Sequence, residues 1–145
     1  MKIKEISRIK GRQVITVRAD ATLAEAIEKL VNNRIGAMPA IDAKGTPVGI
    51  ISERDILKWL HKGSADVRSA RVKDIMTTEV IVGDPEDDIE NILKTMTERG
   101  VRHLPVMSGA SLVGILSLRD VIQERLTECD SQVRYLNDYI AGGYT

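Results

Sequence analysis

The chain carries the same sequence pattern twice, and this repeat constrains its fold more than any other feature. Residues 14–60 and 80–126 align with one single-residue gap, and the match is clearest between segments 48–55 and 113–120. Each copy of such a repeat is one supersecondary unit, which is too small to bury a hydrophobic core alone. We therefore expect two copies packed around a pseudo-twofold axis, so that a site built by one copy has a near-twin in the other.

The predicted order of elements within each copy is strand, helix, strand, strand, helix. Short apolar or alternating stretches typical of strands lie at residues 14–17, 37–41, 48–51, 103–107 and 112–116. Polar residues that can cap a helix N-terminus precede the helical apolar stripes: Thr22, Ser52, Asp88 and Ser117. This order predicts a mixed α/β (α+β) fold made of two β-α-β-β-α repeats.

The two repeats are flanked by segments of different character. We expect an extended N-terminal arm at 1–13, repeats at 14–61 and 80–127, a linker at 62–79, and a C-terminal helix and tail at 128–145. Helical spacing predicts these inward residues: Leu23, Ala26, Ile27, Leu30, Val31, Ile56, Leu57 and Leu60 in the first repeat, and Ile89, Ile92, Leu93, Met96, Leu118, Val121 and Ile122 in the second. In the tail, Val133, Leu136 and Ile140 form an apolar stripe that must pack on something, as at a subunit interface.

The charge balance and the shortage of aromatic residues narrow the functional classes. Lys and Arg together equal Asp and Glu at 21 each, and the chain has three Tyr, one Trp and no Phe. Nucleic-acid surfaces need a basic field or aromatic stacking platforms, so nucleic acid is not an expected partner. No apolar run approaches the ~20 residues of a membrane span. The single cysteine, Cys129, cannot form an internal disulfide, which favours a reducing, cytoplasmic setting.

The repeated element that could carry chemistry is Gly-apolar-apolar-Ser-x-Arg-Asp, at residues 49–55 and 114–120. It lies where a strand turns into a helix, and a helix N-terminus offers unpaired N–H groups and a partial positive charge to a phosphate. The serine hydroxyl and arginine guanidinium can add phosphate contacts, and an aspartate one turn on can accept two hydrogen bonds from a ribose diol. The alternative is a plain capping box, because Ser-x-x-Asp also serves any helix start.

The order of the motifs resembles the tandem pair of cystathionine β-synthase (CBS) domains, also called a Bateman module. Residues 14–17, 35–42 and 49–55 resemble its first half, residues 72–77 its link, and residues 102–106 and 114–120 its second half. The resemblance covers about residues 2–140 and extends to the subfamily in which the pair is the whole protein. It implies two clefts between the repeats that bind AMP, ADP, ATP, NAD(H) or S-adenosylmethionine, and a disc-like homodimer.

In this family each cleft mixes residues of both copies, and the resemblance assigns two sets of nucleotide-binding residues. The first set, here the Asp55 set, is Ser52, Arg54, Asp55, Val82, Arg102, His103 and Leu104. The second set, the Asp120 set, is Ser117, Arg119, Asp120, Thr16, Gly36, Ala37 and Met38. The family often has Ser or Thr in the first strand, a pattern that Thr16 fits and Val82 does not.

The two clefts are expected to differ in charge. Arg102-His103 in the second copy aligns with Gly36-Ala37 in the first. With pairing across copies, the Asp55 cleft gains Arg102 whereas the Asp120 cleft gains no comparable charge. Because charge-assisted contacts dominate phosphate recognition, we expect the Asp55 cleft to prefer phosphorylated ligands.

We interpret the chain as a non-catalytic regulatory module that signals ligand binding to an unidentified regulated protein by a conformational shift. No nucleophile–base pair stands out, so no catalytic residue or catalytic cofactor is expected. His61 and His103 have no cysteine partners at ligand spacing, so no metal site is expected either. Two alternatives remain open: an interaction protein whose clefts are vestigial, and an enzyme that processes nucleotides.

Overall fold

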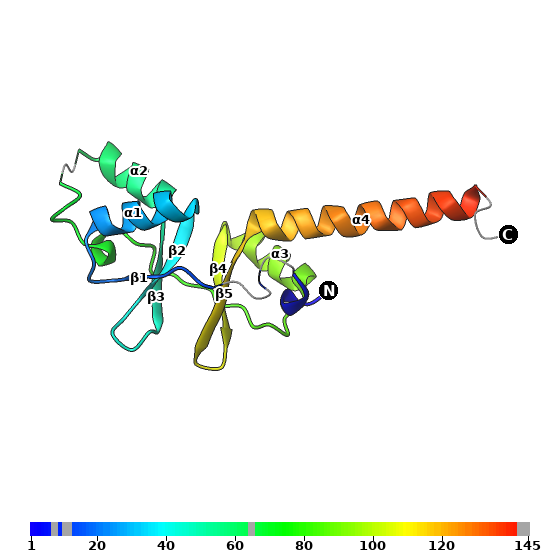
Figure 1. Cartoon of the computed structure of the whole chain (residues 1–145), viewed down its shortest axis with the longest axis horizontal. Helices are drawn as coiled ribbons and strands as arrows, with labels where there is room; N and C mark the ends of the chain where they lie inside the picture. Colours follow the sequence, from blue (N-terminus) through cyan, green and yellow to red (C-terminus); the bar gives the residue numbers. More distant parts are fainter. Residues whose placement is uncertain (7–8, 10–12, 64–65, 142–145) are drawn as a thin grey trace.

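The computed structural model of the chain describes residues 1–6, 9, 13–63 and 66–141, and these form two halves side by side along the long axis (Figure 1). The first half consists of β1 (Val17–Arg18), α1 (Leu23–Asn33), β2 (Ala37–Ile41), β3 (Pro47–Ser52) and α2 (Glu53–His61). The second consists of α3 (Ile89–Arg99), β4 (His103–Ser108), β5 (Ser111–Ser117) and α4 (Leu118–Ile140). Two 3-10 helices, η1 (Ile3–Glu5) and η2 (Val72–Asp74), precede the halves. The mixed α+β class predicted from the repeat is confirmed.

Each half is built on one antiparallel hairpin. In the first sheet β2 pairs with β3 antiparallel and with β1 in parallel, where Val17 lies opposite Ala40. In the second, β4 pairs with β5, and a single parallel bridge from Gly83 to Val106 stands in for the first strand. The strand predicted at 14–17 is thus only Val17–Arg18, and its counterpart is one residue long.

Crowding at Gly83 explains why the two sheets differ. A Cβ atom at Gly83 would lie 2.8 Å from Leu104 Cδ1 and 3.1 Å from Ile3 Cδ1. Ile3, from the N-terminal segment, therefore fills the space that Val17 fills in the first half. The second repeat completes its core with a residue from the chain start instead of one from its own first strand.

The four predicted helix caps are confirmed. Thr22 and Ser52 accept hydrogen bonds from the N–H groups of Glu25 and Asp55, and each forms a full capping box. Asp88 and Ser117 accept from Glu90 and Asp120. A cap contributes about 1 kcal/mol, so the repeated Ser-x-x-Asp pattern has a structural role in both copies.

The N-terminal segment is not the extended arm that we expected. Residues 3–5 form η1, and Ile3 and Ile6 are fully buried in the hydrophobic core of the second half. Conversely, Val72 of η2 is fully buried in the core of the first half. Apolar side chains at both positions drive this packing, because burial stabilises each by roughly 1.5–3 kcal/mol.

The segments η1 and η2 are themselves a repeat. η1 packs on the second half, and η2 packs on the first half. Ile3 donates its N–H to the Asp87 carbonyl over 3.0 Å, and Val72 donates to the Ala21 carbonyl over 2.9 Å. The sequence signal is Ile-Lys-Glu-Ile at 3–6 against Val-Lys-Asp-Ile at 72–75, which the alignment of 14–60 with 80–126 left out.

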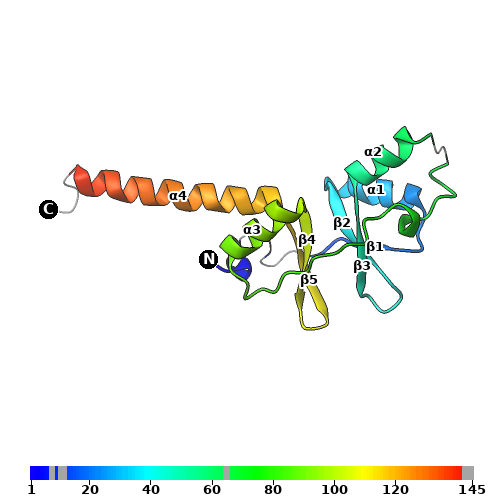
Figure 2. The same ribbon diagram turned by 180° about the vertical axis from the view of Figure 1, so that it is seen from behind.

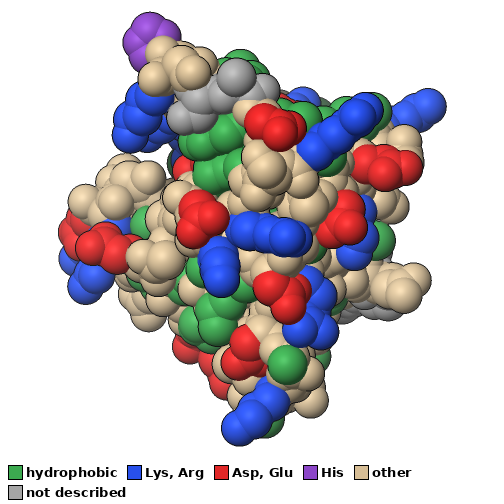
Figure 3. Space-filling view, turned by 90° about the vertical axis from the view of Figure 1, so that its left-hand side faces the viewer, with side chains coloured by type: hydrophobic (Ala, Val, Ile, Leu, Met, Phe, Trp, Pro, Cys, Tyr) green, Lys and Arg blue, Asp and Glu red, His purple; other side chains and the backbone are tan. Residues whose placement is uncertain are grey.

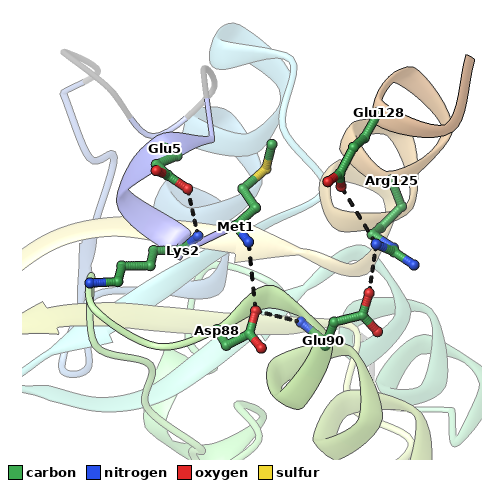
Figure 4. Close-up of polar contacts among 7 residues, drawn as sticks. All are labelled: Met1, Lys2, Glu5, Asp88, Glu90, Arg125 and Glu128. Carbon is green, nitrogen blue, oxygen red and sulfur yellow. Dashed lines mark hydrogen bonds and ion pairs between the residues drawn. The ribbon is translucent and has the colours of Figure 1, made fainter. Parts of the chain in front are cut away.

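Ion pairs hold the N-terminus in place. Lys2 and Lys4 each donate to a different oxygen of Glu86 over 2.7 Å, and these hydrogen bonds lower the pKa of Glu86 to about 2. The terminal amino group lies 3.8 Å from Asp88, while the Lys2 N–H donates to Glu5 (Figure 4). The acidic cluster at 84–88 therefore anchors the chain start as well as the start of α3.

Several residues predicted to face inward are exposed instead. Val31 is 68% exposed and Leu57 is 65% exposed, and Leu60 and Ile122 are also exposed. The first three line an apolar groove of about 680 Å³ between α1 and α2. Helical spacing found an apolar face correctly, but only its inner edge reaches the core of the single chain. At this end of the molecule, basic and acidic side chains alternate with hydrophobic patches (Figure 3).

The last helix is confirmed as an extension through the predicted tail. It runs from Leu118 to Ile140 and projects well beyond the second half in both views (Figures 1 and 2). Residues 142–145, the end of the predicted C-terminal tail, lie outside the described residues. Among the residues that the structure describes, no helix is both long and apolar enough to cross a membrane.

Candidate functional site

A cavity of about 710 Å³ lies between the two halves, beside the junction of β5 and α4. Its described lining from the second half is His103, Gly114, Ile115, Ser117, Arg119 and Asp120. Its lining from the chain start and the first half is Ile9, Gln13, Val14, Ile15, Asn33, Arg34, Ile35, Gly36 and Ala37. The cavity therefore joins both copies of the repeat, as the sequence predicts.

One wall of this cavity is the N-terminus of α4. The Ser117 hydroxyl accepts the Asp120 N–H over 3.0 Å, and Leu118 donates its N–H to the Arg102 carbonyl over 2.7 Å. These bonds fix the first turn, so that the Ser117, Arg119 and Asp120 side chains reach the cavity from one helix start. A helix N-terminus with a cation beside it is a suitable environment for an anion.

The opposite wall comes from the turn between α1 and β2, where Arg34 ends the helix. Arg34 adopts a left-handed conformation with φ 53°, and its N–H caps the carbonyls at the end of α1. The second copy has Gly100 at this position, with φ 65°. A non-glycine residue in this region is strained, and such strain is typical of functional sites.

Arg34 is the site residue that sequence reasoning missed. We expected no comparable charge opposite Asp120, yet the cavity is lined by Arg34 as well as Arg119. The available signal was a basic residue in the first copy where the second has glycine. The Asp120 cavity therefore carries two cationic side chains, and the expected shortage of positive charge on this side is not observed.

His103 also lines this cavity, although the family resemblance assigns it to the Asp55 set. Burial lowers the pKa of His103 below its usual 6.5, and the nearby Asp120 carboxylate acts in the opposite direction. Arg102 lowers this pKa further, whereas Asp55 and Glu53 raise it. Its charge interactions with both motif aspartates place His103 near the boundary between the two predicted clefts.

Five of the seven residues of the Asp120 set line the cavity together: Gly36, Ala37, Ser117, Arg119 and Asp120. Thr16 and Met38 are not among its described lining residues. Met38 is fully buried in the first core, and the Thr16 carbonyl accepts a hydrogen bond from Lys29 Nζ over 2.6 Å. The residues just before Thr16 in the chain, Gln13, Val14 and Ile15, line the cavity instead.

The residues of the Asp55 set make contacts of a different kind. Asp55 Oδ2 accepts the Ser52 N–H over 3.0 Å and the Ser52 hydroxyl over 2.9 Å, while Oδ1 accepts the Thr77 hydroxyl over 3.1 Å. Arg54, Arg102 and Val82 are exposed, and Leu104 is fully buried in the second core. Within the described residues both oxygens of Asp55 thus serve the helix start and the linker.

The linker also lies close against β3 on this side. Thr77 and Ile50 exchange two backbone hydrogen bonds of 2.9 Å, and a Cβ atom at Gly49 would lie 2.6 Å from Met76 Sδ. The motif glycine therefore makes room for the chain itself in the first copy. In the second copy, a Cβ atom at Gly114 would lie 3.3 Å from Ile9, and Gly114 lines the cavity.

No group of three or more His, Cys, Asp or Glu side chains placed to hold a metal ion occurs among residues 1–6, 9, 13–63 and 66–141. Cys129 is exposed on α4 and is not among the described residues that line the cavity. The polar groups of the cavity are thus two guanidinium groups, one carboxylate, a hydroxyl, an imidazole and two side-chain amides. This set suits a ligand that carries both an anionic group and hydroxyl groups.

Two solved structures with this fold carry adenosine compounds. The CBS domain pair of protein MJ0100, in complex with 5'-methylthioadenosine and S-adenosyl-L-methionine, has a TM-score of 0.77 at 24% identity and covers 88% of this chain and 98% of its own. The CBS domain protein PAE2072 from Pyrobaculum aerophilum, complexed with AMP, has a TM-score of 0.74 at 24% identity over 88% and 99% of the two chains. At this identity the likeness concerns the fold.

Proteins with a higher sequence identity to this chain are also named as CBS-domain proteins. The mitochondrial CBS domain-containing protein CBSX3 of Arabidopsis thaliana is 29% identical over 150 residues, which span 98% of this chain and 73% of CBSX3. The CBS-domain containing protein ATU1752 from Agrobacterium tumefaciens is 33% identical with a TM-score of 0.78, over 86% of this chain and 92% of its own. The sequence model of the CBS domain matches residues 3–62 and 72–127. The chain therefore belongs to the CBS domain family and consists of two CBS domains in tandem.

Proposed function

We propose that this protein is a non-catalytic regulatory module that binds an adenosine-containing ligand in the Asp120 cavity. The observation that carries the proposal is the convergence of Arg34, Arg119 and Asp120 on one cavity beside the N-terminus of α4. A cavity of about 710 Å³ has the size typical of small-molecule sites, which run to roughly 300–1,000 Å³.

Each cavity group has a role in this proposal. The Asp120 carboxylate accepts hydrogen bonds from the ribose hydroxyls. Arg34 and Arg119 contact the phosphate from opposite walls, and the Ser117 hydroxyl adds a donor at the helix start. Val14 and Ile15 offer an apolar surface to the base. The ligands of protein MJ0100 and of PAE2072 support an adenosine compound as the class.

The Asp55 set is proposed as a second and weaker site. Asp55 caps α2 and holds Thr77, so a ligand there must compete with contacts that the protein already makes. The residues that the family resemblance adds to this set, among them Val82, Arg102 and Leu104, would line this second site. We assign the stronger affinity to the Asp120 cavity because both Arg34 and Arg119 line it, which reverses the order expected from Arg102.

The signal in this proposal is a shift in population between arrangements of the two halves. A ligand in the cavity contacts both copies, and it biases their relative position only as far as its affinity differs between arrangements. A regulated protein then reads that position. A homodimer as the working unit and a cytoplasmic setting remain our predictions.

The test is thermal unfolding with AMP, ADP, ATP, NADH and S-adenosylmethionine, followed by calorimetric titration of any stabilising compound. A specific ligand raises the melting temperature because it stabilises the folded chain by RT ln(1 + [L]/Kd). Recovery of the ligand unchanged after long incubation supports a binding module. No shift with any compound at millimolar concentration favours an interaction protein, and loss of ligand phosphate favours an enzyme.

A further inference from the structure

The C-terminal helix carries a continuous apolar seam that no other part of the described chain covers. Its residues recur at alternating intervals of four and three: Ile122, Leu126, Cys129, Val133, Leu136 and Ile140. All six are exposed, with Leu136 at 56% and Ile140 at 81%. A run of exposed large apolar side chains of this length marks an interaction surface.

The spacing of the seam identifies the kind of partner. Intervals of four and three repeat every seven residues, which is 3.5 residues per turn, and this period keeps one seam facing a second helix in a left-handed coiled coil. In heptad terms Leu126, Val133 and Ile140 occupy a, and Ile122, Cys129 and Leu136 occupy d. We propose that α4 pairs with α4 of a second copy of this chain as a parallel, in-register, two-stranded coiled coil.

Charge complementarity selects the parallel direction. Arg125 occupies g and Asp130 occupies e of the next heptad, and in parallel pairs g of one helix faces e of the next heptad of the other. Arg125 therefore meets Asp130 of the second copy on each side of the seam. An antiparallel pair with the same overlap would instead place Arg125 at the level of Asn137. Arg125 already uses Nη1 for Glu90 and Glu128, and its guanidinium has five N–H groups to share.

The position of α4 on the molecule agrees with this arrangement. In both views α4 lies on the same side of the sheets as α1 and α2, away from the tips of the hairpins (Figures 1 and 2). A twofold axis parallel to α4 on this side would place the two copies of α4 side by side. The apolar groove between α1 and α2, with exposed Val31 and Leu57, lies on that side too.

Cys129 makes the pairing directly testable, because it occupies a d layer. In a parallel, in-register pair the same residue of each chain meets across the seam, close enough for a disulfide. Full-length protein is treated with diamide, which accepts the two electrons and two protons released as two thiols join. We expect a disulfide-linked dimer, and a dimer mass by light scattering before oxidation. In the Cys129→Ser background, Leu136→Cys should also cross-link.

Matched variants separate the seam from chance collision. Ser131→Cys in the Cys129→Ser background places the thiol on the opposite side of α4 and should cross-link slowly. Val133→Asp should slow Cys129 cross-linking about tenfold or more, because an unpaired carboxylate is costly to bury in the seam. Ser131→Asp adds the same charge outside the seam and should leave the rate unchanged.

Three results from the masses and the cross-linking would overturn the inference, and a fourth concerns the size of the assembly. These are a monomer mass for the unmodified chain, equal cross-linking at positions 129 and 131, or a dimer in which neither Cys129 nor Leu136→Cys cross-links. A trimer or larger assembly also contradicts a two-stranded pair. None of these readouts depends on ligand binding, so the inference and the proposed function fail separately.

Discussion

The Thr77 hydroxyl donates a hydrogen bond to Asp55 Oδ1 over 3.1 Å, and this bond ties the linker to the first copy of the repeated motif. The other Asp55 oxygen accepts from Ser52, so the carboxylate closes a capping box and holds the linker at the same time. Its counterpart Asp120 lines the cavity between the halves. The same motif thus has a mainly structural environment in the first copy and a cavity environment in the second.

This difference predicts that the two aspartates respond differently to the same substitution. Asp120→Asn should weaken binding of an adenosine ligand by about tenfold or more, since a hydrogen bond to a charged group contributes about 1.5–3 kcal/mol. Asp55→Asn should change affinity little but lower stability, because it weakens the cap and the Thr77 contact. Calorimetric titration and chemical denaturation of both variants measure these effects. Equal losses of affinity would show that the clefts are equivalent.

Arg34 offers a variant that separates binding from stability. Arg34→Gly removes a cavity cation and relieves the left-handed backbone, so the folded chain should keep or gain stability while AMP affinity falls. Adenosine affinity should fall much less, because adenosine lacks the phosphate that the guanidinium contacts. Arg102→Ala is the matched variant on the Asp55 side. A larger loss of AMP affinity in Arg102→Ala than in Arg34→Gly would restore the order expected from sequence.

The sequence predicted the caps, the hairpins and the two-copy architecture because these depend on local patterns. Thr22, Ser52 and Ser117 precede helices whose polarity and spacing are visible within a few residues. The packing of Ile3 and Val72 was not visible, since each completes the core of a half that lies elsewhere in the chain. Arg34 was not predicted as a site residue, because its role depends on a turn conformation and on the opposite wall of the cavity.

The exposure of Leu57 has a related cause. A helical apolar stripe indicates burial but cannot say against which molecule, so residues predicted for the core can lie on a surface between chains. Five of the seven predicted Asp120-set residues line the cavity, because the family resemblance assigned residues of both copies to one cleft. Thr16 and Met38 are not among its described lining residues, whereas their chain neighbours Ile15 and Ala37 are.

The motif glycines should differ in their tolerance of a methyl group. Gly49→Ala places a Cβ atom 2.9 Å from the Thr77 carbonyl oxygen, a backbone atom that cannot easily move. Overpacking of this kind costs typically 1–3 kcal/mol. Among the described residues, a Cβ atom in Gly114→Ala comes nearest to the flexible Ile9 side chain, at 3.3 Å, and the substitution should cost less. Urea denaturation of the two variants provides the comparison, and an equal or larger loss at Gly114 would contradict the close packing of the linker.

The anchor of the N-terminus should depend on pH. The pKa of Glu86 is lowered from 4.5 to about 2 by Lys2 and Lys4, so the folded chain favours the ionised carboxylate. Its stabilising effect is complete above pH 4.5 and is lost as the pH falls toward 2. Glu86→Gln should therefore melt below wild type at neutral pH, with the difference shrinking in acid and in high salt.

Asp20→Asn is the matched control for this pH dependence, because Asp20 is the exposed carboxylate at the equivalent position of the first copy. Asp20 contacts Arg18, and in the described part of the chain no pair of lysines bridges it. Its substitution should change the melting temperature less than Glu86→Gln does. The ion pairs would be ruled out as the cause if the difference in melting temperature between wild type and Glu86→Gln stayed constant from neutral pH to pH 2.

The measurement that tests the account most directly is a crystal structure of the protein grown with AMP. We expect AMP at full occupancy in the Asp120 cavity, with its ribose hydroxyls on Asp120 and its phosphate within reach of Arg34 and Arg119. AMP bound only at the Asp55 set, or no AMP bound at saturating concentration, would contradict the central claim.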